Sequence, residues 1–250
     1  MRHRTMALAL LGIALAVTWA LHSAAEDDRP GEEVRRVLAT AIPLARLSYR
    51  SVGGNVILPV RINGSRDLHL ILDTGMSAPI VMLNHREMRQ TLGLEGGHPV
   101  AIAGAGGREP RSGTIFAGAG VSFGGFDLKD QTVIVMDEGR AQSPWTQDGV
   151  IGKSIFDRYV VGIDLDRSVL SVYDPSAFDQ VTDKGIPLSF GSSIPSVPAT
   201  ILPADGEEIP VRLTLDLGAR HALSLDVGKE TKVHPPARTL STIVGRGIQG

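Results

Sequence analysis

The sequence contains no cysteine and few aromatic residues. Its 250 residues have a cysteine count of 0 and an aromatic content of 4%. The absence of cysteine excludes disulfide bonds, thiolate metal sites, a cysteine nucleophile and a lipidated N-terminal cysteine. The low aromatic content, together with 29 glycines and 15 prolines, favours many short strands joined by tight turns over a helical bundle.

The chain also lacks a strong excess of charge of either sign. Its formal net charge is -2, and acidic and basic residues are interspersed along it. We therefore expect neither nucleic acid nor an anionic membrane surface as a partner. The histidines include no pair at metal-ligand spacing, so the sequence predicts no metal site and no cofactor.

A long apolar run lies at the N-terminus. Arg2 and Arg4 precede an apolar stretch over residues 6–21, and the small residues Ser23, Ala24 and Ala25 follow it. This order is typical of a signal peptide over residues 1–25, with a retained membrane anchor as the alternative. We expect the mature protein to be exported to the periplasm or the extracellular space, without membrane attachment after cleavage.

Residues 26–50 are predicted to form an N-terminal helical extension. In this segment Glu32 and Glu33 precede Arg35 and Arg36, and apolar residues recur at helical spacing. Acidic residues at the start of a helix and basic residues near its end both interact favourably with the helix dipole. The extension carries no residues that suggest chemistry.

The pattern changes over residues 51–175 to short strands separated by regular turn signals. Asn63-Gly64, a strong hairpin signal, separates strands predicted over residues 55–62 and 68–72. A short helix with Asn84 as its N-cap is expected after them. The whole segment indicates a compact, mostly antiparallel β domain.

The strand over residues 68–72 ends abruptly in Asp73-Thr74-Gly75. Alternate leucines place one face of this strand in a core and leave a carboxylate at its end. A carboxylate at the edge of an apolar core costs desolvation energy unless it is paired or used. Gly75 permits a sharp turn, and Thr74 offers a hydroxyl for a hydrogen bond to a partner.

Residues 211–218 repeat this pattern, with Asp216 at the strand end and Gly218 two residues later. The hairpin signal Asp205-Gly206 precedes Asp216, and glycine-rich segments follow both aspartates at similar distances, over residues 104–107 and 245–247. The common order at a shift of about 143 residues indicates an internal repeat. Two such carboxylates facing each other would share a proton, and the pair could hydrolyse a carbonyl compound by general acid–base catalysis.

At these motifs the sequence resembles the retropepsin-like aspartic proteases, in particular the exported bacterial ones built from repeated lobes. The matching parts are residues 70–75, a glycine-rich tip in the flap position and a hydrophobic-hydrophobic-Gly element. The tip contains Gly104, Gly106 and Gly107, and the element is Val150-Ile151-Gly152. The resemblance implies an all-β fold, a closed acid-protease barrel lobe over residues 51–175, followed by the start of a second, similar lobe over residues 186–250.

The resemblance further implies peptide-bond hydrolysis of a polypeptide substrate by an Asp-activated water. Asp73 would be the catalytic carboxylate, with Thr74, Gly75 and Gly218 in positioning roles and Val150, Ile151 and Gly152 supporting the Asp loop. The second carboxylate would be Asp216 or, in a homodimer formed through the first lobe, Asp73 of another chain.

Two departures from the family pattern leave an alternative function open. Met76 stands where the family usually has Ala or Ser, and Leu217 stands where Thr is expected. The alternative is a catalytically inactive protease-like domain that binds a peptide or partner protein. Two further interpretations are weaker: residues 245–250 match a dinucleotide-binding pattern without the expected helix and acidic residue, and Ser154 lacks the closing glycine of a nucleophile elbow.

Overall fold

The computed structural model describes most of the chain beyond the predicted signal peptide, which lies outside the described residues. The described residues are 31–103, 109–137, 147–182, 185–191, 193–203, 207–225 and 233. They fall into two compact units, Met1–Ala41 with Phe178–Ile186, and Ile42–Ala177 with Pro187–Gly250. A search of the described helices finds none with the length and apolar character needed to cross a membrane.

The smaller unit contains the predicted N-terminal helix, α2 (Glu32–Thr40). Within this unit the Glu33 carboxylate accepts hydrogen bonds from the backbone N–H and the hydroxyl of Thr182, at 2.8 and 3.0 Å. These two bonds connect the helix to a segment about 150 residues further along the chain.

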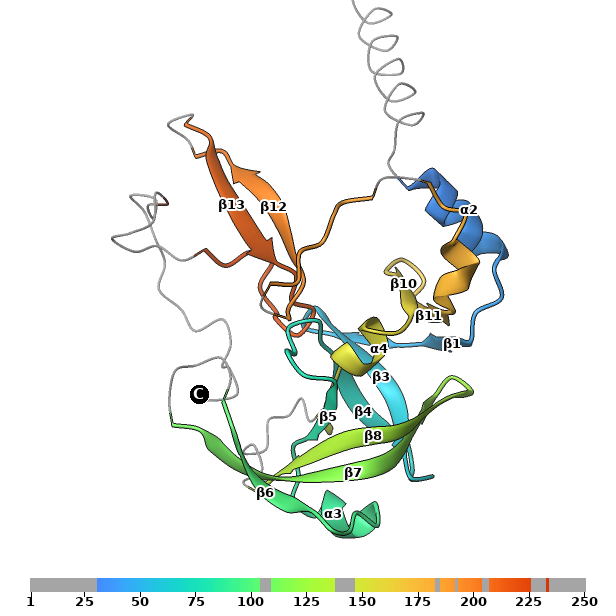
Figure 1. Cartoon of the computed structure of the whole chain (residues 1–250), viewed down its shortest axis with the longest axis vertical. Coiled ribbons are helices and arrows are strands. Elements are labelled where there is room, and N and C mark those ends of the chain that lie inside the picture. Colours follow the sequence, from blue (N-terminus) through green and yellow to red (C-terminus); the bar gives the residue numbers. More distant parts are fainter. Residues whose placement is uncertain are drawn as a thin grey trace, which may run out of the picture. The chain divides into compact units, whose positions relative to one another are not determined.

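Six strands of the larger unit close into a barrel (Figure 1). Neighbouring strands are hydrogen-bonded, and the last pairs back with the first. Their order around the barrel is β3 (Asn55–Ile62), β4 (Leu68–Leu72), β9 (Gly149–Ile151), β5 (Ile80–Leu83), β8 (Phe126–Met136) and β7 (Arg111–Phe123). The closing pair joins Arg61 and Ile62 of β3 to Ser122 and Val121 of β7. The predicted all-β fold with a closed acid-protease-like lobe is confirmed.

Two strands extend the same sheet, and two short helices accompany it. The strands are β2 (Arg50–Val52), which pairs with β3, and β6 (His98–Ile102), which pairs with β7. The helices are α3 (Met88–Thr91) and α4 (Lys153–Phe156).

Glycine-containing turns set the register of the two main hairpins. Asn63 and Gly64 join β3 to β4 with φ angles of 50° and 74°. Gly124 and Gly125 join β7 to β8 with φ angles of 55° and 83°. Positive φ at both central residues matches the right-handed twist of the strands, which is why Asn-Gly and Gly-Gly suit these positions.

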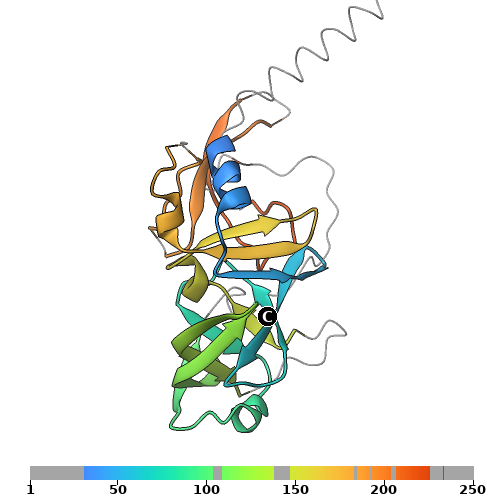
Figure 2. The ribbon, with the colours of Figure 1, turned by 90° about the vertical axis from the view of Figure 1, so that its right-hand side faces the viewer.

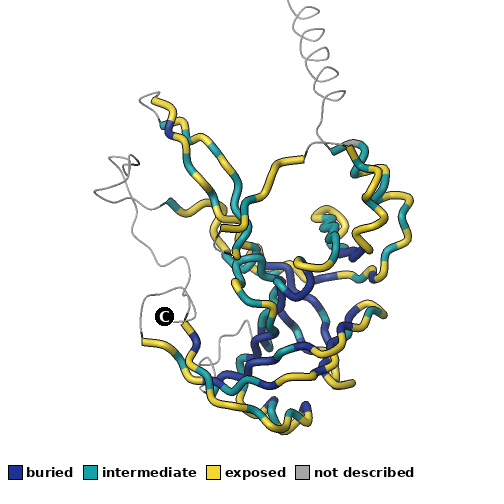
Figure 3. Tube along the Cα trace, viewed as in Figure 1, coloured by how far each residue is buried: buried dark blue, intermediate teal, exposed yellow. Residues whose placement is uncertain are grey.

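The core lies inside the barrel, where the strands are drawn mostly in dark blue in Figure 3. Strand β4 illustrates how the sequence produces it, because Leu68, Leu70 and Leu72 are buried while His69 and Ile71 between them are half-buried. Successive side chains of a strand point to opposite faces, so the alternate leucines all enter the core. The burial continues to Leu72, the last residue of β4, directly before Asp73.

A second, three-stranded sheet consists of β1 (Ala45–Ser48), β11 (Val169–Tyr173) and β10 (Val160–Asp164). Figure 2 shows the blue strand β1 beside the yellow strands. The helical extension predicted over residues 26–50 includes residues 45–48, which form a strand instead. The four-residue strand is too short to show a period in the sequence, and its pairing with β11 places Ala45 in the core.

The strands β12 (Ser196–Ile201) and β13 (Ile209–Thr214) form an antiparallel hairpin, drawn in orange in Figure 1. Within the described part of the chain these two strands belong to no larger sheet. Their register runs from Ser196 opposite Thr214 to Ile201 opposite Ile209. The hairpin signal Asp205-Gly206 and the glycine-rich segment 245–247 lie outside the described residues. The main contribution of the hairpin to the site is that β13 leads directly to Asp216.

Candidate active site

Asp73 stands at the end of β4, in a loop whose backbone binds both its main chain and its side chain. The Asp73 N–H donates to the carbonyl of Ile151 at 2.9 Å. The N–H of Gly75 donates to Asp73 Oδ1 at 2.6 Å. The first bond continues the pairing of β4 with β9, and the second fixes the direction of the carboxylate.

Strand β9 supports the Asp73 loop because it inserts between β4 and β5. It runs parallel to β4 and antiparallel to β5. Two glycines make the insertion sterically feasible: a Cβ on Gly149 would overlap the Met82 carbonyl, and a Cβ on Gly152 would overlap the Asp73 carbonyl. The element Val150-Ile151-Gly152 therefore lies directly against the Asp73 loop.

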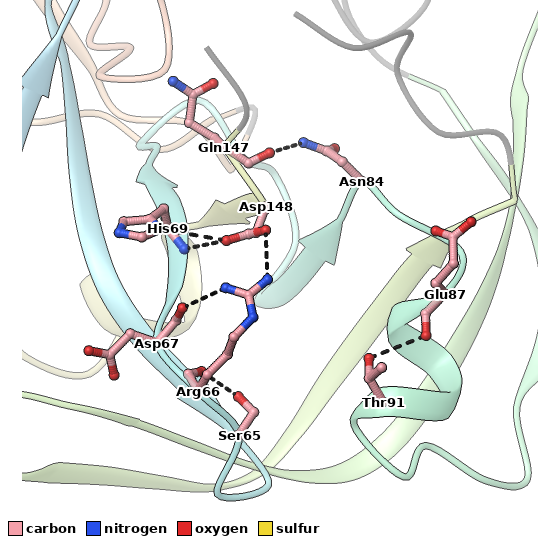
Figure 4. Close-up of polar contacts among 9 residues, drawn as sticks. All are labelled: Ser65, Arg66, Asp67, His69, Asn84, Glu87, Thr91, Gln147 and Asp148. Carbon is pink, nitrogen blue, oxygen red and sulfur yellow. Dashed lines mark hydrogen bonds and ion pairs between the residues drawn. The ribbon is translucent and has the colours of Figure 1, made fainter. Parts of the chain in front are cut away.

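A polar network fixes the residues just before β9, near the start of β4 (Figure 4). Asp148 Oδ2 accepts a hydrogen bond from the backbone N–H of His69 at 2.7 Å, and the Arg66 guanidinium lies 3.7 Å from Asp148 Oδ1. The Asn84 amide donates to the carbonyl of Gln147 at 3.1 Å. Asn84 was predicted to cap a helix and does not, because its side chain is used in this network and α3 begins only at Met88.

Asp216 follows β13 in a loop with similar local bonds. The N–H groups of Gly218 and Ala219 donate to Asp216 Oδ1 at 2.9 and 3.1 Å. The N–H of Leu215 donates to the carbonyl of Pro195 at 2.9 Å, so the loop is also tied to the residue before β12.

The two Asp loops pack against each other through their glycines. A Cβ on Gly75 would lie 2.8 Å from Asp216 Oδ1, and a Cβ on Gly218 would lie 2.5 Å from Asp73 Cγ. Either distance is too short for a real side chain, so both positions require glycine. The structure thus brings Asp73 and Asp216 of one chain together, close enough for the charge of Asp216 to act on Asp73.

Thr74 connects the first loop to the second. Its Oγ1 donates to the carbonyl of Leu215 at 2.6 Å and accepts the N–H of Leu217 at 3.0 Å. Leu217, the corresponding residue of the second loop, has no hydroxyl to return this contact, and its side chain packs against the barrel core instead. The hydroxyl contact between the loops is therefore made from one side.

The pKa of Asp73 is raised from 3.8 to about 6. The largest cause is burial, and the negative charge of Asp216 comes second. The hydrogen bond to Asp216 also raises the pKa, while the N–H groups of Gly75 and Gly218 lower it. All three raising effects favour the protonated form, so Asp73 retains a proton at mildly acidic pH. Asp216 is exposed, so water can reach the two carboxyl groups at Asp216.

The remaining predicted site residues take other positions. Met76 packs beside an apolar cluster made by Met82, Ile102, Ile134 and Met136. The glycines of the predicted flap, Gly104, Gly106 and Gly107, lie outside the described residues. Among the side chains that the structure describes, no three His, Cys, Asp or Glu residues come together as a metal site.

Two residues of the site were missed by sequence reasoning, Asn55 and Arg220. Asn55 is 1% exposed at the start of β3. Its amide donates to the carbonyls of Leu217 and Gly218 at 3.0 and 2.9 Å and accepts from Arg220 Nε at 3.1 Å. One signal was available: Asn55 is a polar residue at the start of a strand that is otherwise almost entirely apolar.

Comparison with known proteins agrees with the fold around Asp73. Residues 58–155 match a family model described as aspartyl protease, a range that includes β4, the Asp73 loop and β9. A search of curated proteins found no match. Together with the closed barrel and the glycine-supported Asp73 loop, the family match shows that residues 58–155 are similar to the retropepsin-like aspartyl proteases.

Proposed function

We propose that this protein is an aspartic-type endopeptidase in which Asp73 and Asp216 of one chain form the catalytic pair. The observation that carries the proposal is the reciprocal packing of the two Asp loops, each with its glycine against the other's carboxyl group. The aspartyl protease match over residues 58–155 supports the choice of a peptide bond as the target. The substrate is then a polypeptide, and the reaction consumes one water per bond.

In the proposed mechanism the pair enters the reaction with one proton, held on Asp73 because its pKa is raised to about 6. Asp73 donates this proton to the scissile carbonyl oxygen while Asp216 takes a proton from the attacking water. The water oxygen bonds to the carbonyl carbon and forms a tetrahedral diol. When the C–N bond breaks, the proton on Asp216 passes to the amine nitrogen, and Asp73 recovers its own proton from the diol.

The first prediction concerns the two carboxylates. Asp73→Asn and Asp216→Asn should each reduce cleavage of a peptide library at pH 4 to 6 by about 1,000-fold or more, because general acid–base catalysis by a pair fails without either member. Asp127→Asn, at an exposed position on β8, is the matched control and should cleave normally. Product peptides would be identified by mass spectrometry.

Each other result of this experiment has a definite meaning. If Asp216→Asn remains active and activity rises with the square of protein concentration, two Asp73 residues in a homodimer form the site and the single-chain pair is wrong. Peptide binding without turnover at any pH would show a non-catalytic binding domain. Unchanged cleavage in Asp73→Asn would remove Asp73 from the reaction.

A further inference from the structure

We propose that Asn55 is a positioning residue for the second carboxylate, because it fixes the two peptide units that orient Asp216 against Asp73. The proposal rests on the catalytic pair described above and extends it to a residue outside both Asp loops. Asn55 belongs to β3 of the barrel, whereas the groups that it binds belong to the segment after β13.

The geometry of the peptide units carries the inference. The carbonyl of Leu217 and the N–H of Gly218 are the two ends of one planar peptide unit, and the carbonyl of Gly218 and the N–H of Ala219 are the ends of the next. Asn55 Nδ2 binds both carbonyls, at 3.0 and 2.9 Å. On the opposite side, both N–H groups bind Asp216 Oδ1, at 2.9 and 3.1 Å. The side chain of Asn55 therefore controls the direction of the two donors that hold the carboxylate.

The chemistry of the partners determines the orientation of the Asn55 amide. Backbone carbonyls can only accept hydrogen bonds, and the Arg220 guanidinium can only donate them. Nδ2 must therefore face Leu217 and Gly218, and Oδ1 must face Arg220 Nε. Arg220 itself lies over the turn before β3, with its Nε 3.6 Å from where a Cβ on Gly53 would be. No aliphatic side chain could supply the two donors.

Asn55 also compensates for the missing hydroxyl at Leu217. In the first loop Thr74 binds the backbone of the second loop, at Leu215 and Leu217. A second hydroxyl contact is absent because Leu217 is apolar and packs on the core. The loop of Asp216 is thus held to the first lobe by Thr74 on one side and by Asn55 with Arg220 on the other.

The test compares Asn55→Leu, which has nearly the same shape and no donors, with Asn63→Gly. Asn63 also uses its amide for two backbone contacts, to Leu92 and Gly120, at the β3–β4 turn. Glycine tolerates its positive φ of 50°. We expect Asn55→Leu to lower kcat by about 10- to 100-fold with little change in KM, because the reacting groups are misplaced while substrate contacts remain. Asn63→Gly should keep the wild-type values.

A second readout follows the Asp73 carboxyl directly by NMR and needs no substrate. Among the described residues, Asp216 is the ionisable side chain whose charge acts on Asp73. When Asp216 is no longer held in place, the titration midpoint of Asp73 should move from about 6 toward its ordinary value of 3.8. The same downward shift is expected in Asp216→Asn and not in Asn63→Gly.

If Asn55→Leu fails to fold, Arg220→Met decides the question, because this exposed residue loses only the donor that orients the Asn55 amide. A smaller fall in kcat and a smaller downward shift of the Asp73 midpoint are expected. Wild-type values of kcat and of the midpoint in Asn55→Leu, or in Arg220→Met where Asn55→Leu does not fold, would overturn the positioning role. If no chain cleaves peptide while the midpoints shift as expected, the proposed function fails and the role of Asn55 stands.

Discussion

Asp73 and Asp216 carry the same functional group in different surroundings. Asp73 is half-buried at the end of a core strand, and Asp216 is exposed at the end of a two-stranded hairpin. Burial disfavours a charged carboxylate, and a neighbouring negative charge disfavours it further, so the proton of the pair is held on Asp73. The two environments thus affect the same functional group differently, and Asp73 is the carboxyl group whose protonated form is favoured.

This assignment predicts how stability depends on pH. The native state holds the Asp73 proton up to a pKa of about 6, whereas the unfolded chain releases it near 3.8. Between these values the native state binds more protons, so the free energy of unfolding should fall as pH rises from about 4 through about 6, by at most about 3 kcal/mol. Urea unfolding at pH 4, 5, 6 and 7 measures this change in the free energy of unfolding.

The substitution Asp73→Asn should flatten the pH dependence of stability in this interval, because an amide does not titrate. The pKa values of Asp164 and Asp174 are lowered, by the Arg167 N–H and by the Ser176 hydroxyl respectively. The contributions of Asp164 and Asp174 to stability are present above the pKa of each carboxyl group in the unfolded chain, and they are lost only as pH falls below that value. They therefore do not obscure the effect of Asp73. Parallel stability curves for wild type and Asp73→Asn would contradict the prediction.

Among the elements, β9 supports the Asp73 loop, whereas the Asp216 loop is supported by side chains. The Asp73 loop has β9 inserted beside it, with the Asp73 N–H bonded to the Ile151 carbonyl. Among the described residues, the Asp216 loop has no comparable strand beside it, and its support comes from Thr74 and Asn55. The second carboxylate therefore depends on contacts from the first lobe.

The close approach of β9 predicts a severe effect for Gly152→Ala. The new methyl group would overlap the Asp73 carbonyl, so either β9 or the Asp73 loop must move. We expect a loss of about 2–3 kcal/mol or more in the free energy of unfolding, together with a loss of cleavage.

Gly120→Ala is the matched control for this substitution. Its Cβ would meet nothing closer than 3.8 Å, so its stability should stay within about 0.5 kcal/mol of wild type. Urea unfolding followed by circular dichroism measures both variants. Equal stability of the two variants would show that the insertion of β9 is looser than described.

At the scale of the molecule, the barrel and the β12–β13 hairpin differ in how they are held. Each barrel strand is paired on both sides, and the barrel closes through β3 and β7. Strands β12 and β13 pair with each other, and most of their side chains are exposed or half-buried. A two-stranded hairpin is only marginally stable without such neighbours.

Native-state hydrogen exchange should separate these two parts of the larger unit. We expect the amides of β12 and β13 to open at a free energy about 2 kcal/mol or more below that of β4 and β9. The amides of β4 and β9 should exchange only through global unfolding. Equal protection in both sets would show that the hairpin and the barrel unfold as one cooperative unit.

Local sequence patterns were sufficient for much of the fold. The alternating leucines of β4, the positive-φ turn at Asn63-Gly64 and the hydrophobic-hydrophobic-Gly element each depend on neighbouring residues. The strand over Asn55–Ile62 was predicted with its observed bounds for the same reason. Short elements without a period, such as β1, were missed because pairing with a distant strand creates them.

The β class of the protein, the position of Asp73 at a strand end and the need for glycine after it follow from sequence patterns alone. The contacts of Asn55 and Arg220 with the Asp216 loop, the packing of Leu217 on the core and the raised pKa of Asp73 arise only in the folded chain. Their cause is contact between distant parts of the chain, since Asn55 contacts residues 162 to 165 positions away. Such contacts leave no periodic or local pattern in the sequence, so sequence patterns do not reveal them.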